Sequence, residues 1–173
     1  MQRSLALILW FGLILLTSCA TLPPELQGQT SPLTLSQVMH HPEAYQGKTV
    51  RWGGTILKLE NAADQTRIQI LARPLDRSGR PRADANPLGR FLAHTSAFLD
   101  PAIYAPGREL TVVGKLAGTT EVTVGQRKIR IPTVEAERWH LWPRRERKSP
   151  VVVYPYWWYG FGWWYYPWGP CCW

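Results

Sequence analysis

The stretch "GKTVRWGGTIL", residues 47–57, carries the pattern that decides the fold. Val50, Trp52 and Ile56 fall on one face of an extended chain, and Thr49, Arg51 and Thr55 fall on the other. Two adjacent glycines, at positions 53 and 54, suit a β-bulge or a sharp coil of the strand. The stretch therefore predicts a β-strand with one buried face and a bend at the glycine pair.

Similar alternation recurs as far as residue 142. The segments that show it are "TVRWGGTILKLE" (49–60), "TRIQILARPL" (66–75), "GRFLAHTS" (89–96), "RELTVVGKLAG" (108–118) and "TVEAERWHLW" (133–142). "VTVGQRKIRI" (122–131) predicts a hairpin that turns near Gly125, and "DRSGRPRADANP" (76–87) predicts one long loop. Five or six short strands predict a mainly β fold over residues 33–142, a small antiparallel barrel of OB-like form.

One short helix is expected before the first strand. In "LTLSQVMHHPEAYQGK" (33–48), Thr34 or Ser36 is a suitable N-cap, and Leu35, Val38 and Met39 line one side. Pro42 and Gly47 limit its length, so the predicted helix content is low.

The first twenty residues predict export and lipidation. Arg3 precedes an apolar run over 5–16 that is too short for a bilayer, which needs about 20 apolar residues, so residues 1–18 are interpreted as a signal peptide. Leu16-Thr17-Ser18-Cys19 resembles the lipobox of bacterial lipoproteins. That resemblance implies a diacylglyceryl thioether on Cys19, cleavage before it and acylation of the new amine. The alternative is a buried cysteine after an ordinary signal peptide.

Residues 19–32 are predicted to be the lipidated N-terminus and a semi-extended spacer, because three prolines and no apolar period follow Cys19. With Cys19 acylated, only Cys171 and Cys172 remain, so no disulfide framework is predicted. These two could form a vicinal disulfide, pair with another chain or stay free. Neither a metal site nor a cofactor is predicted.

Residues 143–173 form a basic linker, "PRRERKSP" (143–150), followed by a Trp/Tyr-rich tail. Glycines and prolines break every helical or strand pattern in the tail. Cations beside tryptophans are typical of the headgroup zone of a bilayer. The residues hypothesised to lie there are Arg144, Arg145, Arg147, Lys148, Trp157, Trp158, Trp163, Trp164 and Trp168. Recognition of a protein or glycan is a second interpretation, and a disordered tail without a ligand is a third.

Catalysis and nucleic-acid binding are both disfavoured. The four histidines stand in no recognised catalytic or metal-binding motif, and Asp100-Pro101 is interpreted as the start of a turn. The net charge of +8 fits a nucleic-acid partner, but export argues against one, and the cations are not interleaved with aromatic residues on the strands. Anionic lipid or lipopolysaccharide is the nearer partner for this charge.

Three segments resemble the Slp family of starvation-inducible outer-membrane lipoproteins. They are "YQGKTVRWGGTI" (45–56), "GRFLAHTSAFLDPAIYAPGRELTVVGKLAG" (89–118) and "VEAERWHLWP" (134–143), within a resemblance that covers residues 19–142. It implies a lipid-anchored protein of the Gram-negative outer membrane with a role in stress or stationary phase. We expect the domain to face the periplasm, with exposure on the cell surface as the alternative. Only Cys19 carries over as a functional residue. Two function classes stay open: a structural or surface-modifying envelope lipoprotein, and a binding module that recognises a protein, glycan or small ligand.

Overall fold

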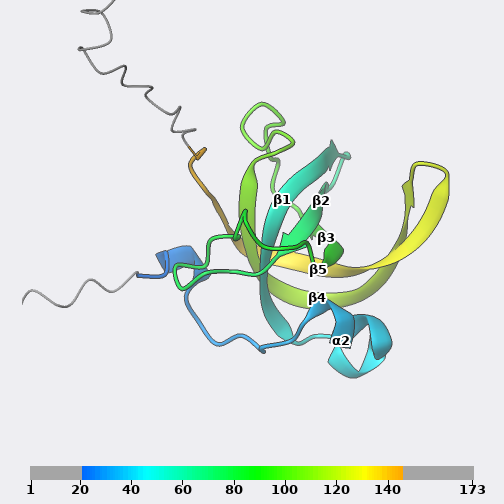
Figure 1. Cartoon of the computed structure of the whole chain (residues 1–173). Helices are drawn as coiled ribbons and strands as arrows, with labels where there is room; N and C mark the ends of the chain where they lie inside the picture. Colours follow the sequence, from blue (N-terminus) through cyan, green and yellow to red (C-terminus); the bar gives the residue numbers. More distant parts are fainter. Residues whose placement is uncertain (1–20, 146–173) are drawn as a thin grey trace, which may run out of the picture.

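The computed structural model describes residues 21–145, which fold into one closed five-stranded barrel (Figure 1). Around the barrel the strands follow the order β1-β2-β3-β5-β4, and β4 returns to β1. The strands are β1 (Thr49–Asn61), β2 (Thr66–Arg73), β3 (Gly89–Thr95), β4 (Glu109–Val124) and β5 (Arg127–Leu141). The predicted mainly β, OB-like barrel is confirmed.

Four of the five ladders are antiparallel, but the ladder that closes the barrel is not. β3 and β5 run parallel over three pairs, from Leu92 opposite Thr133 to His94 opposite Glu135. The hairpin and the last strand, which the sequence suggested as separate elements, are parts of the same pair of long strands, because β5 runs unbroken through Pro132. Pro132 has no N–H to donate to the ladder. Its partner on β4 is Thr119, and the β4–β5 register shifts just before this pair, between Leu116 and Thr119.

The glycine pair in β1 marks close approach of neighbouring backbones, not a bulge. A Cβ on Gly54 would lie 1.9 Å from the carbonyl oxygen of Leu71, and one on Gly53 would lie 2.9 Å from that of Leu110. The register shift in β1 falls later, between Ile56 and Lys58. The predicted bulge is therefore absent at the glycine pair, where β1 pairs in regular register with both β2 and β4.

The barrel interior is filled by the alternating apolar side chains that the sequence predicted. Val50, Trp52 and Ile56 are all buried, and the Trp52 ring meets Phe91 edge to face with centroids 5.5 Å apart. Ile68 and Ile70 of β2 join the same cluster.

The predicted helix is α2 (Leu35–His40), which follows the short 3-10 turn η1 (Pro24–Leu26) and precedes η2 (Glu43–Tyr45). Thr34 is its N-cap and forms a capping box with Gln37. Leu35 and Val38 are buried against the barrel, and Met39 is half-buried. Within residues 21–145 no helix combines the length and apolar character needed to cross a bilayer.

Candidate functional site where the N- and C-terminal segments meet the barrel

The N-terminal segment, residues 21–28, packs on the outside of the barrel. Leu26 is completely buried in a second small core with Val113 and Trp142, and Leu22 packs against it. Residues 19–32 were predicted to be the lipidated N-terminus and a semi-extended spacer; within them the structure packs Leu22 and Leu26 against the barrel and forms a short turn at Pro24–Leu26. The prolines at 23 and 24 start the turn η1, and that turn directs Leu26 onto the outer surface of the barrel, against Val113 and Trp142.

Two arginines fix the end of this segment. Arg138 of β5 donates from Nη1 to the carbonyl of Gln27 at 2.6 Å, and Arg51 of β1 donates from Nη2 to the carbonyl of Gly28 at 3.2 Å. Burial, and then the neighbouring charge of Arg138, lower the pKa of Arg51. The carbonyls of Gln27 and Gly28 each accept a hydrogen bond from one guanidinium group. The N-terminal segment thereby holds the like charges of Arg138 and Arg51 close together.

The C-terminal segment, residues 142–145, begins at the buried Trp142. Its indole Nε1 donates to Thr111 Oγ1 at 3.0 Å, and that hydroxyl donates in turn to the carbonyl of Gly79 at 2.8 Å. Gly79 lies in the long loop between β2 and β3, residues 74–88. A Cβ added to Gly79 would lie 2.7 Å from Leu22 Cδ1, so this loop is close to the N-terminal segment. Trp142 is therefore the point where the N-terminal segment, the C-terminal segment and the long loop meet.

Glu109 holds the C-terminal segment onto the barrel. One carboxylate oxygen of this half-buried side chain accepts from Arg80 Nε at 2.7 Å, and the other accepts from Arg145 Nε at 2.9 Å. The same two arginines donate to backbone carbonyls, Arg80 to Pro143 and Arg145 to Pro81, each at 2.7 Å. Charge-assisted bonds of this kind are stronger than neutral ones, so the chain is held to the barrel as far as residue 145.

The long loop is ordered so that Arg80 can reach Glu109. Asp76 accepts hydrogen bonds from the backbone N–H groups of Ser78 and Arg80, at 2.8 and 3.0 Å. Burial raises the pKa of Asp76, but hydrogen bonds from Ser78 and Arg80 outweigh it and hold the pKa below its ordinary value. The Arg80 guanidinium also lies 5.6 Å from the centre of the Trp142 ring.

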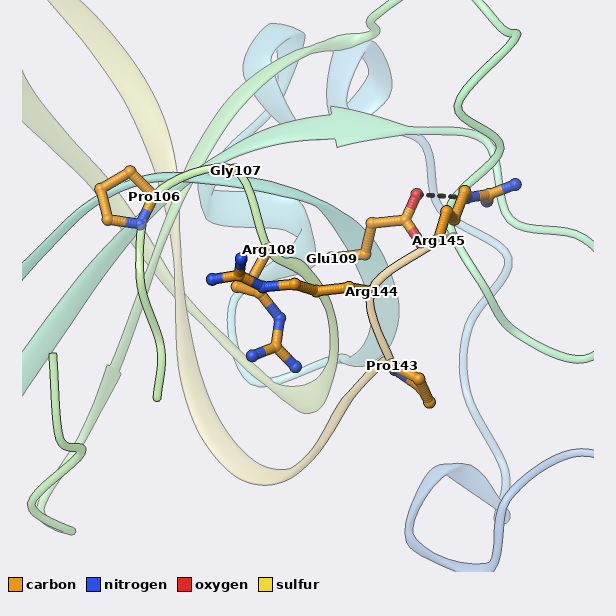
Figure 2. A pocket seen from close by; sticks show the side chains of 7 residues that line it. All are labelled: Pro106, Gly107, Arg108, Glu109, Pro143, Arg144 and Arg145. Carbon is orange, nitrogen blue, oxygen red and sulfur yellow. Dashed lines mark hydrogen bonds and ion pairs between the residues drawn. The ribbon is translucent and has the colours of Figure 1, made fainter. Parts of the chain in front are cut away.

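A cavity of about 340 Å³ lies between this segment and the start of β4 (Figure 2). It is lined by Pro106, Gly107, Arg108, Glu109, Pro143, Arg144 and Arg145. Arg108 donates to the carbonyls of Ile103 and Trp142, while its Nε is buried without a partner in the described structure. Arg144 is exposed and its side chain extends toward Arg108 in Figure 2. Among the residues that line the cavity, Arg108, Arg144 and Arg145 are cations and Glu109 is the single carboxylate, so the lining carries a net positive charge.

A second hollow, a groove of about 310 Å³, lies beside the β4–β5 hairpin. Its lining mixes charges of both signs, including Lys58, Glu60, Arg67 and Glu121. Gln69 is half-buried at this groove, and its amide nitrogen is covered and has no hydrogen-bond partner. The groove therefore offers one unsatisfied donor among mixed charges.

The structure describes two of the residues predicted at a membrane interface. Arg144 is exposed at the rim of the cavity, and Arg145 is paired with Glu109 while 48% of its side chain stays exposed. Cys19 and the remaining predicted interface residues lie outside residues 21–145; the latter are Arg147, Lys148, Trp157, Trp158, Trp163, Trp164 and Trp168. Sequence reasoning missed Leu26, Arg80 and Glu109. Among these, only Leu26 could have been found from the sequence, because Leu22 and Leu26 are spaced four residues apart, as on one face of a helical turn.

Asp100 and His94, which were considered as candidates for chemistry, have structural roles in the described fold. Asp100 opens a turn as predicted, since its Oδ1 accepts from the N–H of Ala102 at 2.8 Å. His94 pairs across the sheet with Arg67 and Glu135. Within residues 21–145, no three His, Cys, Asp or Glu side chains are grouped so that they could bind a metal ion.

Replacing Leu26 by alanine should detach the N-terminal segment. We expect a loss of about 2–5 kcal/mol in the free energy of unfolding for a fully buried leucine. We also expect fast hydrogen exchange at the N–H of Gln27, which is bonded to the carbonyl of Pro24. Leu35→Ala is the matched control. Leu35 is a buried residue of α2, so this change should lower stability without changing exchange at Gln27. Equal protection of Gln27 in both variants would contradict the docking of this segment.

Comparison with known proteins assigns the chain to a family. It is 31% identical over 155 residues to the uncharacterized lipoprotein YeaY of Escherichia coli K12, a match that covers 87% of this chain and 79% of the relative. It is also 31% identical over 151 residues to the outer membrane protein Slp of the same organism, covering 86% and 79%. A single-stranded DNA-binding protein from Streptomyces coelicolor is similar in structure at 12% identity and a TM-score of 0.36, over 55% of this chain and 94% of that one.

The match to a family model extends further than the resemblance noted from the sequence. The model of the outer membrane lipoprotein Slp family covers residues 16–170, which include Cys19, the whole barrel and most of the aromatic tail. The chain belongs to the Slp family of outer membrane lipoproteins.

Proposed function

We propose that this protein is a non-catalytic envelope lipoprotein, anchored through acyl chains on Cys19 and held with its positively charged surface against the outer membrane. The observation that carries the proposal is the docking of Leu22 and Leu26 on the barrel. Leu22 follows Cys19 by three residues, which span about 10 Å at full extension. An acylated Cys19 would therefore keep this side of the barrel next to the lipid headgroups.

The charge of the same surface supports contact with anionic lipid. Arg144 and the half-exposed Arg145 lie at its rim, and Arg147 and Lys148 follow in the sequence after Glu146. A cation placed next to an anionic membrane surface contributes about 1 kcal/mol. Phosphates of lipid headgroups or lipopolysaccharide provide the matching negative charge.

The described part of the chain also ends at this surface. Arg145, its last residue, is bonded to Glu109 and Pro81, and Trp142 packs against Leu26 of the N-terminal segment. We propose that the tail tryptophans lie in the headgroup zone of the leaflet that holds the lipid. Two linked contacts reinforce each other through effective concentration, even where the second is weak alone. The barrel would then face the periplasm and modify or stabilise the membrane surface under stress or in stationary phase.

A charge-matched pair of variants tests the contact with headgroups. In the non-lipidated chain, the triple change Arg144→Ala, Arg147→Ala and Lys148→Ala should weaken binding to anionic vesicles by roughly 100-fold at low salt, from about 1 kcal/mol per cation. The matched control removes two arginines and one lysine from the β4–β5 hairpin, at Arg127, Lys128 and Arg130. Vesicle co-sedimentation gives the affinities. Equal losses in both triple variants would contradict a membrane contact specific to the C-terminal segment.

The groove beside the β4–β5 hairpin favours a second candidate function, an envelope binding module. The unpartnered amide nitrogen of Gln69 is the specific observation in its favour, because rotation of this side chain, which lines the groove, would bring the covered nitrogen to a ligand acceptor. Titration with soluble peptidoglycan fragments, followed by NMR, should shift the Gln69 side-chain amide and the backbone around Thr120. If neither position shifts, the groove does not bind peptidoglycan fragments.

A further inference from the structure

The loop between β3 and β4, residues 96–108, presents two large apolar side chains to solvent. Phe98 is 73% exposed and Ile103 is 53% exposed. Among the large apolar side chains of residues 21–145, only Leu88 is comparably exposed, at 53%, and it lies near α2 beside Leu33 and Leu35. Two of the three exposed apolar side chains in the described part of the chain therefore belong to one loop. We call residues 96–108 the apolar loop.

The backbone of the apolar loop is fixed, so the exposure of Phe98 is built into the fold. Leu99, its neighbour, is buried in the main core, and the carbonyl of Leu99 accepts from Asn61 Nδ2 at 3.0 Å. On the other side of Phe98, the carbonyl of Ala97 accepts from Thr66 Oγ1 at 2.9 Å. These anchors prevent Phe98 from folding back onto the barrel.

The apolar loop is attached directly to the C-terminal segment. Arg108, at its base, donates to the carbonyl of Ile103 at 3.1 Å and to that of Trp142 at 3.0 Å. Tyr104 accepts a hydrogen bond from Trp139 Nε1 at 3.0 Å. In Figure 1 the loop forms the green lobe at the top, the described chain ends beside it in orange, and the yellow β4–β5 hairpin lies on the other side of the barrel.

We propose that the apolar loop inserts Phe98 and Ile103 into the lipid leaflet that holds the acyl anchor. The inference rests on the proposed function, since the anchor on Cys19 supplies the bilayer. Arg108, at the base of the loop, and Arg144, of the C-terminal segment, both line the cavity, where headgroup phosphates would meet them. Apolar side chains next to cations are the pattern of proteins that lie in the interface, with the apolar groups about 5–10 Å into the headgroup and acyl boundary. The bilayer is the occupant that this combination of charge, apolar side chains and anchor fits.

Fluorine NMR of the full lipidated chain in nanodiscs tests the insertion. After removal of the signal peptide, fluorophenylalanine would report on Phe91, Phe98 and Phe161. Nitroxide-labelled lipid should broaden the Phe98 signal strongly and leave the completely buried Phe91 sharp. Leu88→Phe adds a matched reporter at an exposed site near α2, which should also stay sharp. Phe161→Leu assigns the tail signal, which reports on the proposed tail contact independently.

The outcomes separate the inference from the proposed function. A chain that does not stay on the nanodiscs contradicts the anchor, and the inference fails with it. A chain that stays on the nanodiscs with a Phe98 signal as sharp as those of Phe91 and the Leu88→Phe reporter overturns the insertion alone. That second result is also what a loop docked on a protein partner would give.

Discussion

Gly54→Ala should abolish folding of the barrel. The new Cβ would lie 1.9 Å from the carbonyl oxygen of Leu71 and 2.6 Å from its carbonyl carbon, distances at which atoms overlap. Both atoms belong to the backbone of β2, which pairs with β1 and β3, so no side-chain rotation relieves the clash. Domains are stable by about 5–15 kcal/mol in total, and separating two central strands would remove most of that. Circular dichroism should show neither native strand content nor a cooperative thermal transition.

Gly47→Ala is the control for this variant. Gly47 has a φ of 77°, but a Cβ there meets nothing within 4 Å. Only the backbone strain remains, which costs about 1–3 kcal/mol, so the protein should fold and melt at a lower temperature. A folded Gly54→Ala variant with a melting temperature equal to that of Gly47→Ala would contradict the close approach of β1 and β2.

Cys19→Ala, exported behind an ordinary signal peptide that is cleaved without lipidation so that no apolar leader remains, should release the protein from the membrane. Acyl chains on Cys19 would contribute about 0.8 kcal/mol per buried CH₂, and two or three chains together hold a protein almost irreversibly. Without them only the proposed contacts of the basic and aromatic segments would remain, and salt would weaken the basic part. After a wash in high salt, membrane fractionation should find the variant in the soluble fraction and the unaltered protein in the outer membrane.

The two other cysteines provide the control for this result. The double change Cys171→Ala and Cys172→Ala removes two thiols from the tail and leaves the predicted lipid site intact. This variant should fractionate like the unaltered protein. Retention of Cys19→Ala in the membrane after the salt wash would show that acylation at this position is not what holds the chain.

The sequence predicted the strands and the core well because alternation is a local signal. Val50, Trp52 and Ile56 were placed on the buried face from their spacing alone, and the turn near Gly125 was found from its residues. The parallel β3–β5 ladder could not be predicted in the same way. It depends on which strands meet when the barrel closes, and no local pattern encodes that.

The candidate site was harder to predict because tertiary contacts create it. Leu26 is buried only because Trp142 and Val113, remote in sequence, form a place for it. Prolines around such a leucine favour a spacer when the partners are not known. Glu109 likewise gave no sign that it would pair with both Arg80 and Arg145. Arg144, in contrast, is exposed, as a basic linker residue is expected to be.

Mass spectrometry of the N-terminal peptide, from protein purified out of outer membranes, tests the central claim most directly. We expect a peptide that begins at Cys19, with a diacylglyceryl group on its sulfur and an acyl group on its amine. A mature chain that begins at any other residue, or one that begins at Cys19 without fatty chains, would contradict the account.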